Sequence, residues 1–119
     1  MANVKLGTKA VGSIVKIKVN GASKDFIVVQ QGNPNTSTYD SSCNGTWLLM
    51  KDIYTTSTFG NNNSYKDSSI HTYLNGTFYN LIDSNIRAAI KQVKIPYQNG
   101  TGSGGSLATG SNGLSTKVF

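Results

Sequence analysis

The feature that most constrains the fold is an alternating apolar stretch near the N-terminus, S-I-V-K-I-K-V at residues 13–19. Apolar residues at positions 15, 17 and 19 share one side of an extended chain, as in a half-buried β-strand. The Asn20-Gly21 pair then interrupts the run, as a two-residue hairpin turn does. The next segment, F-I-V-V at residues 26–29, is apolar on both faces and is typical of a strand inside a sheet. The sequence therefore predicts an antiparallel hairpin over residues 12–31.

Two polar loops flank a further apolar segment. Residues 33–45 and 55–66 are rich in Asn, Ser and Thr, whereas residues 46–54, T-W-L-L-M-K-D-I-Y, are apolar enough for a third, central strand. Ser, Thr and Asn make up 39 of the 119 residues. Because these residues favour turns, caps and strand surfaces over helix interiors, we expect more sheet and loop than helix.

The pattern changes at residue 67, where a helix is expected. Asp67 and Ser68 are good N-cap residues, and side chains suited to one buried face then recur at steps of three and four. The residues on this expected face are Ile70, Tyr73, Leu74, Thr77, Phe78 and Leu81. The Asn75-Gly76 pair predicts a C-terminal stop inside this stretch.

A second short helix is expected after residue 82. Asp83 or Ser84 can cap it. Its expected inward-facing residues are Ile86, Ala89 and Ile90.

The C-terminal third predicts strands around a loop. Residues 92–97, Q-V-K-I-P-Y, predict a strand with Pro96 at an edge or an end. Residues 98–113 are rich in Gly and Ser and predict a flexible loop or linker. Residues 114–119, L-S-T-K-V-F, predict a final strand that pairs with its own sheet or with that of a neighbouring molecule. Together the elements predict a single α+β domain over residues 1–119, with an antiparallel sheet, an N-terminal hairpin and two short helices on one side.

Three segments carry a resemblance to a known family. They are G-S-I-V-K-I-K-V-N-G through D-F-I-V-V-Q-Q-G-N-P, then Y-D-S-S-C-N-G-T-W-L-L-M-K-D-I-Y, then S-S-I-H-T-Y-L-N-G-T-F with I-R-A-A-I-K-Q-V-K-I-P-Y. Together they resemble an uncharacterised domain family common in gut Firmicutes and their phages and prophages, found in phage structural or surface proteins and in cell-surface proteins. The S-x-I-x-x-Y-L-N-x-x-F stretch at residues 68–78 is also similar to a motif of C-type-lectin-like and formylglycine-generating-enzyme-like folds.

The resemblance implies a compact, C-type-lectin-like α+β fold with no established activity. His71 and Tyr73 stand where the wider lectin-like pattern has Arg and Trp. Such domains usually continue past the K-V-F end with further strands. The resemblance therefore implies a shortened form that is incomplete at the C-terminus, or a piece that another subunit completes.

Reactive side chains are too few for a familiar catalytic or metal centre. His71 is the only histidine; Asp67 lies one helical turn before it, near enough to pair, but no G-x-S-x-G nucleophile elbow is present. One histidine and one cysteine cannot supply the four ligands that zinc takes, and the usual calcium loop is absent. Cys43 lies in a polar loop and is interpreted as a small turn residue. We therefore expect no enzyme, no metal and no cofactor.

The charge balance leaves one alternative function open. The formal net charge is +6, from 11 Lys plus Arg against five acidic residues. Proteins that read nucleic acids usually cluster this charge and use Arg, whereas here Arg87 is the only arginine and the lysines are dispersed. Scattered lysines are also typical of solubility and of protected strand edges. Nucleic-acid binding through dispersed lysines stays the alternative.

Aromatic side chains in the two polar loops form the candidate binding surface. Flat rings among amides and hydroxyls suit sugars or a protein partner. The candidate ligand-binding residues are Tyr39, Asp40, Phe59, Asn62 and Tyr65. Trp47 and Tyr54 are expected to fold back onto the core, whereas for the three loop rings both orientations stay open.

These observations lead to one functional prediction. We expect a non-enzymatic phage or prophage structural or surface domain that assembles with copies of itself or with another structural protein. Loops 33–45 and 55–66 are the expected contacts for a receptor or glycan. The N-terminus has no apolar run long enough for a signal peptide, and no segment approaches the ~18 apolar residues of a membrane span. We therefore expect the protein in a virion or in the bacterial cytoplasm, without membrane contact.

Overall fold

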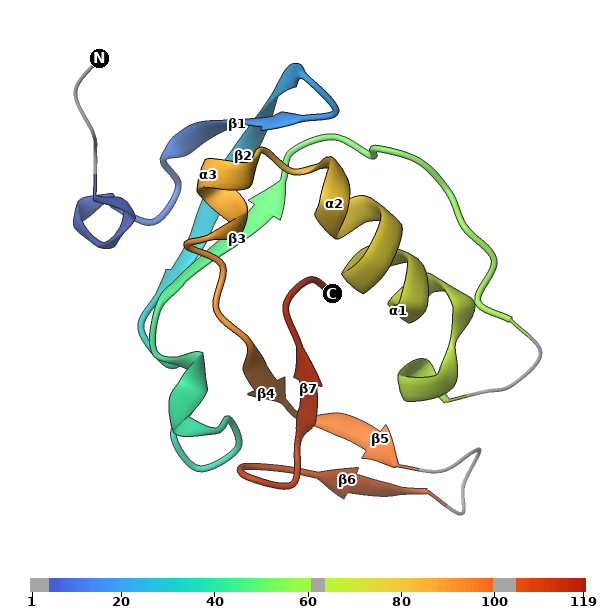
Figure 1. The fold of residues 1–119 in the computed structure, drawn as a ribbon. Coiled ribbons are helices and arrows are strands. Elements are labelled where there is room, and N and C mark those ends of the chain that lie inside the picture. The colour runs from blue at the N-terminus through green and yellow to red at the C-terminus, as the bar shows by residue number, and fades with distance from the viewer. Residues whose placement is uncertain (1–4, 61–63, 100–104) are drawn as a thin grey trace.

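The N-terminal hairpin is present in the computed structural model, which describes residues 5–60, 64–99 and 105–119. Strand β1 (Ile14–Val19) pairs antiparallel with strand β2 (Ala22–Gln31) (Figure 1). Asn20 and Gly21 connect them with φ angles of 52° and 78°, the left-handed conformation that a tight hairpin turn requires. The predicted hairpin is therefore confirmed.

The third strand lies at the edge of this sheet. Strand β3 (Thr46–Met50) pairs antiparallel with β2, in the order β1-β2-β3, so the prediction that it is central is wrong. The strand is apolar on both faces because each face packs against a different core. Leu48 and Met50 pack on the first core, and Trp47 packs on the second. The strand also ends at Met50 rather than at Tyr54.

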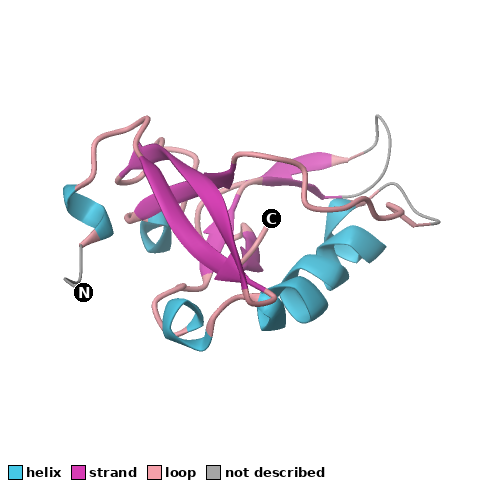
Figure 2. Cartoon of the chain, turned by 90° about the horizontal axis from the view of Figure 1, so that it is seen from above, coloured by secondary structure: helices cyan, strands magenta, loops and turns pink. Residues whose placement is uncertain are grey.

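The first core lies between the three-stranded sheet and the helices. Ile17 and Val19 of β1 are buried together with Phe78 and Ile82. The covering helical run consists of α1 (Ser69–Tyr73), the π-helical segment η4 (Leu74–Phe78) and α2 (Tyr79–Leu81). Figure 2 shows this run, the longest helical element, beside the strands.

The helical run does not stop where the sequence predicts. Asn75 and Gly76 lie inside η4, where the helix widens by one residue per turn and continues. A short α3 (Ser84–Arg87) follows, and Ile86 and Ile90 pack on the first core as predicted. Ala89 is exposed, so its predicted inward position is wrong.

Two small sheets build a second core. Strand β4 (Val93–Ile95) pairs with β7 (Leu114–Thr116), and β5 (Tyr97–Asn99) pairs with β6 (Ser106–Ala108), all antiparallel. The final strand therefore pairs within its own chain rather than with a neighbour. Cys43, Ile95 and Leu114 are buried here. The expected loop over residues 98–113 contains β6 and the end of β5, and residues 100–104 lie outside the described residues.

Three single-turn 3-10 helices complete the described part of the chain: η1 (Leu6–Thr8), η2 (Ser41–Cys43) and η3 (Tyr65–Asp67). The α+β class, the antiparallel pairing and the helices over one face of the hairpin sheet are confirmed, although the strands form three separate sheets rather than one. Among the described residues no helix has the length and apolar character needed to cross a bilayer.

Candidate functional site

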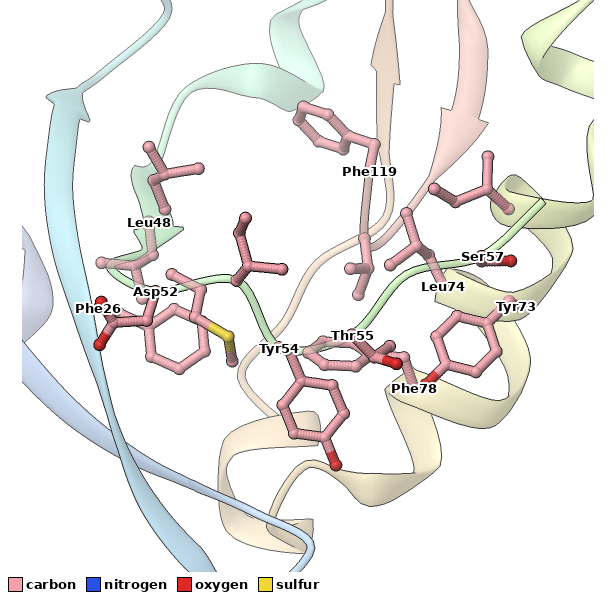
Figure 3. Close-up of a pocket in the computed structure, with 15 residues that line it drawn as sticks. Phe26, Leu48, Asp52, Tyr54, Thr55, Ser57, Tyr73, Leu74, Phe78 and Phe119 are labelled. Carbon is pink, nitrogen blue, oxygen red and sulfur yellow. The ribbon is translucent and has the colours of Figure 1, made fainter. Parts of the chain in front are cut away.

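An open apolar groove runs between β3 and the helical run. Its volume is about 280 Å³. Figure 3 shows Leu48 on one side, Tyr73, Leu74 and Phe78 on the other, and Tyr54 and Thr55 between them. The full set of lining residues is Phe26, Leu48, Leu49, Met50, Asp52, Ile53, Tyr54, Thr55, Ser57, Ile70, Tyr73, Leu74, Phe78, Val118 and Phe119.

Large apolar side chains at this groove face water. Leu49 is 57% exposed, Ile53 88% and Phe119 51%. Asp52 is the one acidic lining residue. The groove can therefore take up apolar side chains or an apolar surface of a partner, and it offers little for charge-driven chemistry.

The helical wall of the groove is fixed by a buried cap. Ser68 is fully buried, and its hydroxyl accepts a 3.1 Å hydrogen bond from the backbone N–H of His71 while donating one of 2.6 Å to the carbonyl of Tyr65. This is the N-cap that the sequence predicts at the start of the helix. It sets the position at which Ile70 enters the groove.

The C-terminal wall is held by one side chain, Asn75. Its amide nitrogen donates to the carbonyls of His71 (3.1 Å) and Val118 (2.8 Å). Its amide oxygen accepts from the Thr116 hydroxyl (3.1 Å) and from the backbone N–H groups of Lys117 (2.8 Å) and Val118 (3.2 Å). Residues 116–118 are thereby fixed to the helix, which brings Val118 and Phe119 to the groove.

An aromatic chain links the groove to the second core. The Phe119 ring meets the Trp47 ring edge-on at 5.5 Å between centroids, and Trp47 meets Tyr39 in the same way at 5.6 Å. The Trp47 indole N–H donates to the carbonyl of Cys43 at 3.0 Å. Trp47 therefore folds onto the core, and Tyr54 packs edge-on against Phe78 at 5.3 Å, as predicted for both.

The predicted loop residues take up different roles in the structure. Tyr39 is half-buried against Trp47. Asp40 caps η2, where its carboxylate accepts a 3.0 Å bond from the N–H of Ser42. Hydrogen bonds from Ser42 lower the pKa of the Asp40 carboxyl from its usual value. Phe59 is 43% exposed, and Asn62 lies outside the described residues.

Tyr65 is the most enclosed of these rings. It packs between Phe59 (6.5 Å) and His71 (5.1 Å). Its hydroxyl is buried and has no hydrogen-bond partner among the described residues. Burial raises the pKa of this phenol.

The two predicted loops do not meet on one surface. In Figure 1 residues 33–45 and η3 lie on opposite sides of β4 and β7. Tyr39 and Tyr65 both turn toward the second core, which decides the orientation that the sequence left open. Phe59 is the loop ring that stays exposed.

Cys43, interpreted from the sequence as a small turn residue in a polar loop, ends the single-turn helix η2 but is also part of a core. It is 1% exposed within the second core, and its thiol donates to the carbonyl of Lys94 at 3.1 Å. Burial raises the pKa of the thiol, which disfavours the reactive thiolate. No cluster of three His, Cys, Asp or Glu side chains suited to a metal ion occurs in the described part of the chain.

Sequence reasoning missed the groove. The pattern marked residues 46–54 as a central strand, which would leave no open edge for a groove. Ile53 could have indicated the groove, because it follows the charged pair Lys51-Asp52 and so departs from the apolar run of the strand. In the structure it is the most exposed large apolar side chain among the described residues.

Residues 44–119 match the model of a family described as "Domain of unknown function (DUF6273)". The chain belongs to this family. The DUF6273 match covers β3, the helical run and strands β4 to β7, and leaves out the β1–β2 hairpin. No curated protein and no solved structure matches the chain.

The DUF6273 match includes every lining residue of the groove except Phe26. It also includes the motif at residues 68–78, whose members Ser68 and Asn75 hold two of the groove walls. The origin in gut Firmicutes or their phages, and the likeness to C-type-lectin-like folds, stay predictions.

Proposed function

We propose that this DUF6273 domain is a non-enzymatic interaction module of a phage or prophage particle or of a bacterial surface, and that it docks onto another structural protein through the apolar groove. The observation that carries the proposal is that Leu49, Ile53 and Phe119, three of the eight exposed large apolar side chains among the described residues, border this one cavity. Contiguous exposed apolar surface of this kind marks interaction sites. Burying it contributes roughly 25 cal/mol per Å².

The roles of the motif residues support binding over catalysis. Ser68 caps a helix and Asn75 fixes the C-terminal segment, so both are engaged in shaping the groove. The His71 ring packs beside the Tyr65 ring. Its backbone N–H donates to Ser68, and its carbonyl accepts from Asn75. The particle or surface setting is supported by the sequence resemblance described above.

Two other predicted contacts stay predictions. Phe59 offers an exposed ring to a receptor or glycan, whereas Tyr39, Asp40 and Tyr65 are half-buried. Nucleic-acid binding through the dispersed lysines also stays a prediction, and three of these lysines form local contacts: Lys16 with Asp25, Lys91 with the Asn44 carbonyl and Lys94 with the Ser111 carbonyl.

Co-expression with the products of the flanking genes tests the proposal. We expect a tail, capsid or surface protein to copurify with the tagged wild-type domain and to be lost with Ile53→Asp. Val11→Asp is the matched control, because Val11 is 61% exposed and does not line the groove. Equal copurification of the two variants, or flanking genes that encode no particle or surface protein, would contradict the proposal.

A further inference from the structure

The strand that forms one wall of the groove is also the open edge of a sheet. Within residues 5–60, 64–99 and 105–119, β3 pairs only with β2. No backbone hydrogen bond outside the β2–β3 ladder involves residues 46–50 in that part of the chain. In an edge strand about half of the N–H and C=O groups point away from the neighbouring strand. Those of β3 are available to another strand.

The two edges of this sheet are built differently. β1 carries Lys16 and Lys18, and lysines on an edge strand oppose pairing with another chain. The sequence of β3, T-W-L-L-M, has no charge and no proline. Only β1 therefore carries this protection, and β3 keeps the character of a template for strand addition.

The lining of the groove beside β3 is mostly apolar, with Asp52 as its charged residue. A second, more polar hollow adjoins it at Met50, Asp52, Ile53 and Tyr54, and this hollow is also lined by Lys24 and Asp25. The Lys24 ammonium lies 6.0 Å from the ring centroid of Tyr54, another lining residue. Lys24 therefore stands beside two aspartates, Asp25 and Asp52, in a chain of net charge +6. This net charge favours a segment with acidic residues.

We propose that the occupant is an extended segment of a partner polypeptide, which adds to the free edge of β3. Its alternate side chains are apolar and enter the groove beside Leu48 and Ile53, and acidic residues at its ends suit the net positive charge of the chain. Backbone hydrogen bonds to β3 supply affinity, and the groove selects the side chains, as in other cases of strand addition. The inference rests on the proposed function and specifies the form of the partner.

A synthetic peptide tests this directly. The probe is acetyl-Asp-Val-Ser-Val-Ser-Val-Asp-amide, with binding followed by isothermal titration calorimetry and by hydrogen exchange of the β3 amides. We expect binding to slow exchange at residues 46–50. Leu49→Asp should weaken the affinity by about tenfold or more, whereas Leu107→Asp should change it by less than about twofold. Leu107 is a matched control, since it is 61% exposed on β6, outside the groove.

A second peptide separates strand addition from simple apolar contact. It has the same sequence with N-methyl groups on the nitrogens of all five residues between the two aspartates, which removes the backbone donors that face β3 in either strand direction and leaves every side chain in place. We expect it to bind at least about tenfold more weakly. Equal affinity of the two peptides would overturn strand addition, even if a structural protein still copurifies through the groove. Dimers formed by wild type and lost with Leu49→Asp in sedimentation velocity would also overturn it, since a second copy would then be the occupant.

Discussion

Asn75 joins two parts of the chain that are 43 positions apart. An asparagine is suited to this place because its side chain both donates and accepts, and here it donates to two carbonyls and accepts from three donors. The motif at residues 68–78 includes Asn75, whereas the Asn75-Gly76 pair predicts a helix stop at this place. The sequence could not reveal its partners at residues 116–118, since these lie more than forty positions later in the chain.

Asn75→Asp should lower the free energy of unfolding by about 1–3 kcal/mol. The carboxylate keeps the acceptor atoms but loses both donors, which leaves the carbonyls of His71 and Val118 without this partner. Urea unfolding measures the change. The control is Asn80→Asp in the same helical run, where Asn80 is exposed and a change within about 0.5 kcal/mol is expected. Equal stabilities of the two variants would show that the hydrogen bonds of Asn75 do not stabilise the contact between the helix and residues 116–118.

Tyr65→Phe should leave the stability unchanged or raise it at neutral pH. The hydroxyl that this change removes is buried without a hydrogen-bond partner in the described residues, so its loss costs no bond and relieves a desolvated group. Urea unfolding at pH 7 measures the difference between the two proteins. A marked loss of stability would reveal a partner for the hydroxyl.

The same substitution should alter the response to alkaline pH. Burial raises the pKa of Tyr65 above its usual value of 10.0, so the unfolded chain loses this proton at lower pH than the folded one. The contribution of the phenol to stability is therefore complete below pH 10 and is lost as the pH rises through the folded-state pKa. Unfolding curves above pH 10 should show wild type losing stability faster than Tyr65→Phe. Parallel curves would mean that the phenol is solvated.

At the scale of elements, the hairpin and the helix start could be predicted from sequence because local rules decide them. Alternation sets β1, the Asn20-Gly21 turn sets the hairpin, and Ser68 caps the helix. The position of β3 at an edge could not be predicted in this way. A strand with two apolar faces is consistent with a central position or with contacts to two cores, and only the tertiary structure distinguishes them.

Two glycines provide a test of the element boundaries. A Cβ atom at Gly113 would lie 2.6 Å from the carbonyl oxygen of Ile95, in the β4 strand that β7 pairs with. Gly113→Ala should therefore lower stability by about 1–3 kcal/mol through strain in that pair.

A Cβ atom at Gly76 meets nothing within 4 Å, so Gly76→Ala should raise stability by up to about 1 kcal/mol if the helix continues through it. Thermal unfolding measures both. A destabilised Gly76→Ala would favour the helix stop that the sequence suggests.

At the scale of the whole molecule, the surface charge bears on the nucleic-acid alternative. The lysines are dispersed and several form local contacts, so we expect only weak, sequence-independent binding to DNA or RNA. Fluorescence anisotropy at two salt concentrations should show any affinity at low salt falling steeply as salt is raised. Tight binding that persists at physiological salt and differs between sequences would favour nucleic acid over a protein as the ligand of this domain.

The chain has one tryptophan, and its indole ring touches Phe119 at the groove and Tyr39 in the second core. A molecule that enters the groove and shifts Phe119 changes the surroundings of this single fluorophore. The domain therefore contains its own optical reporter of occupancy. Collections of unlabelled peptides can be screened by emission wavelength alone, with no dye attached to either molecule.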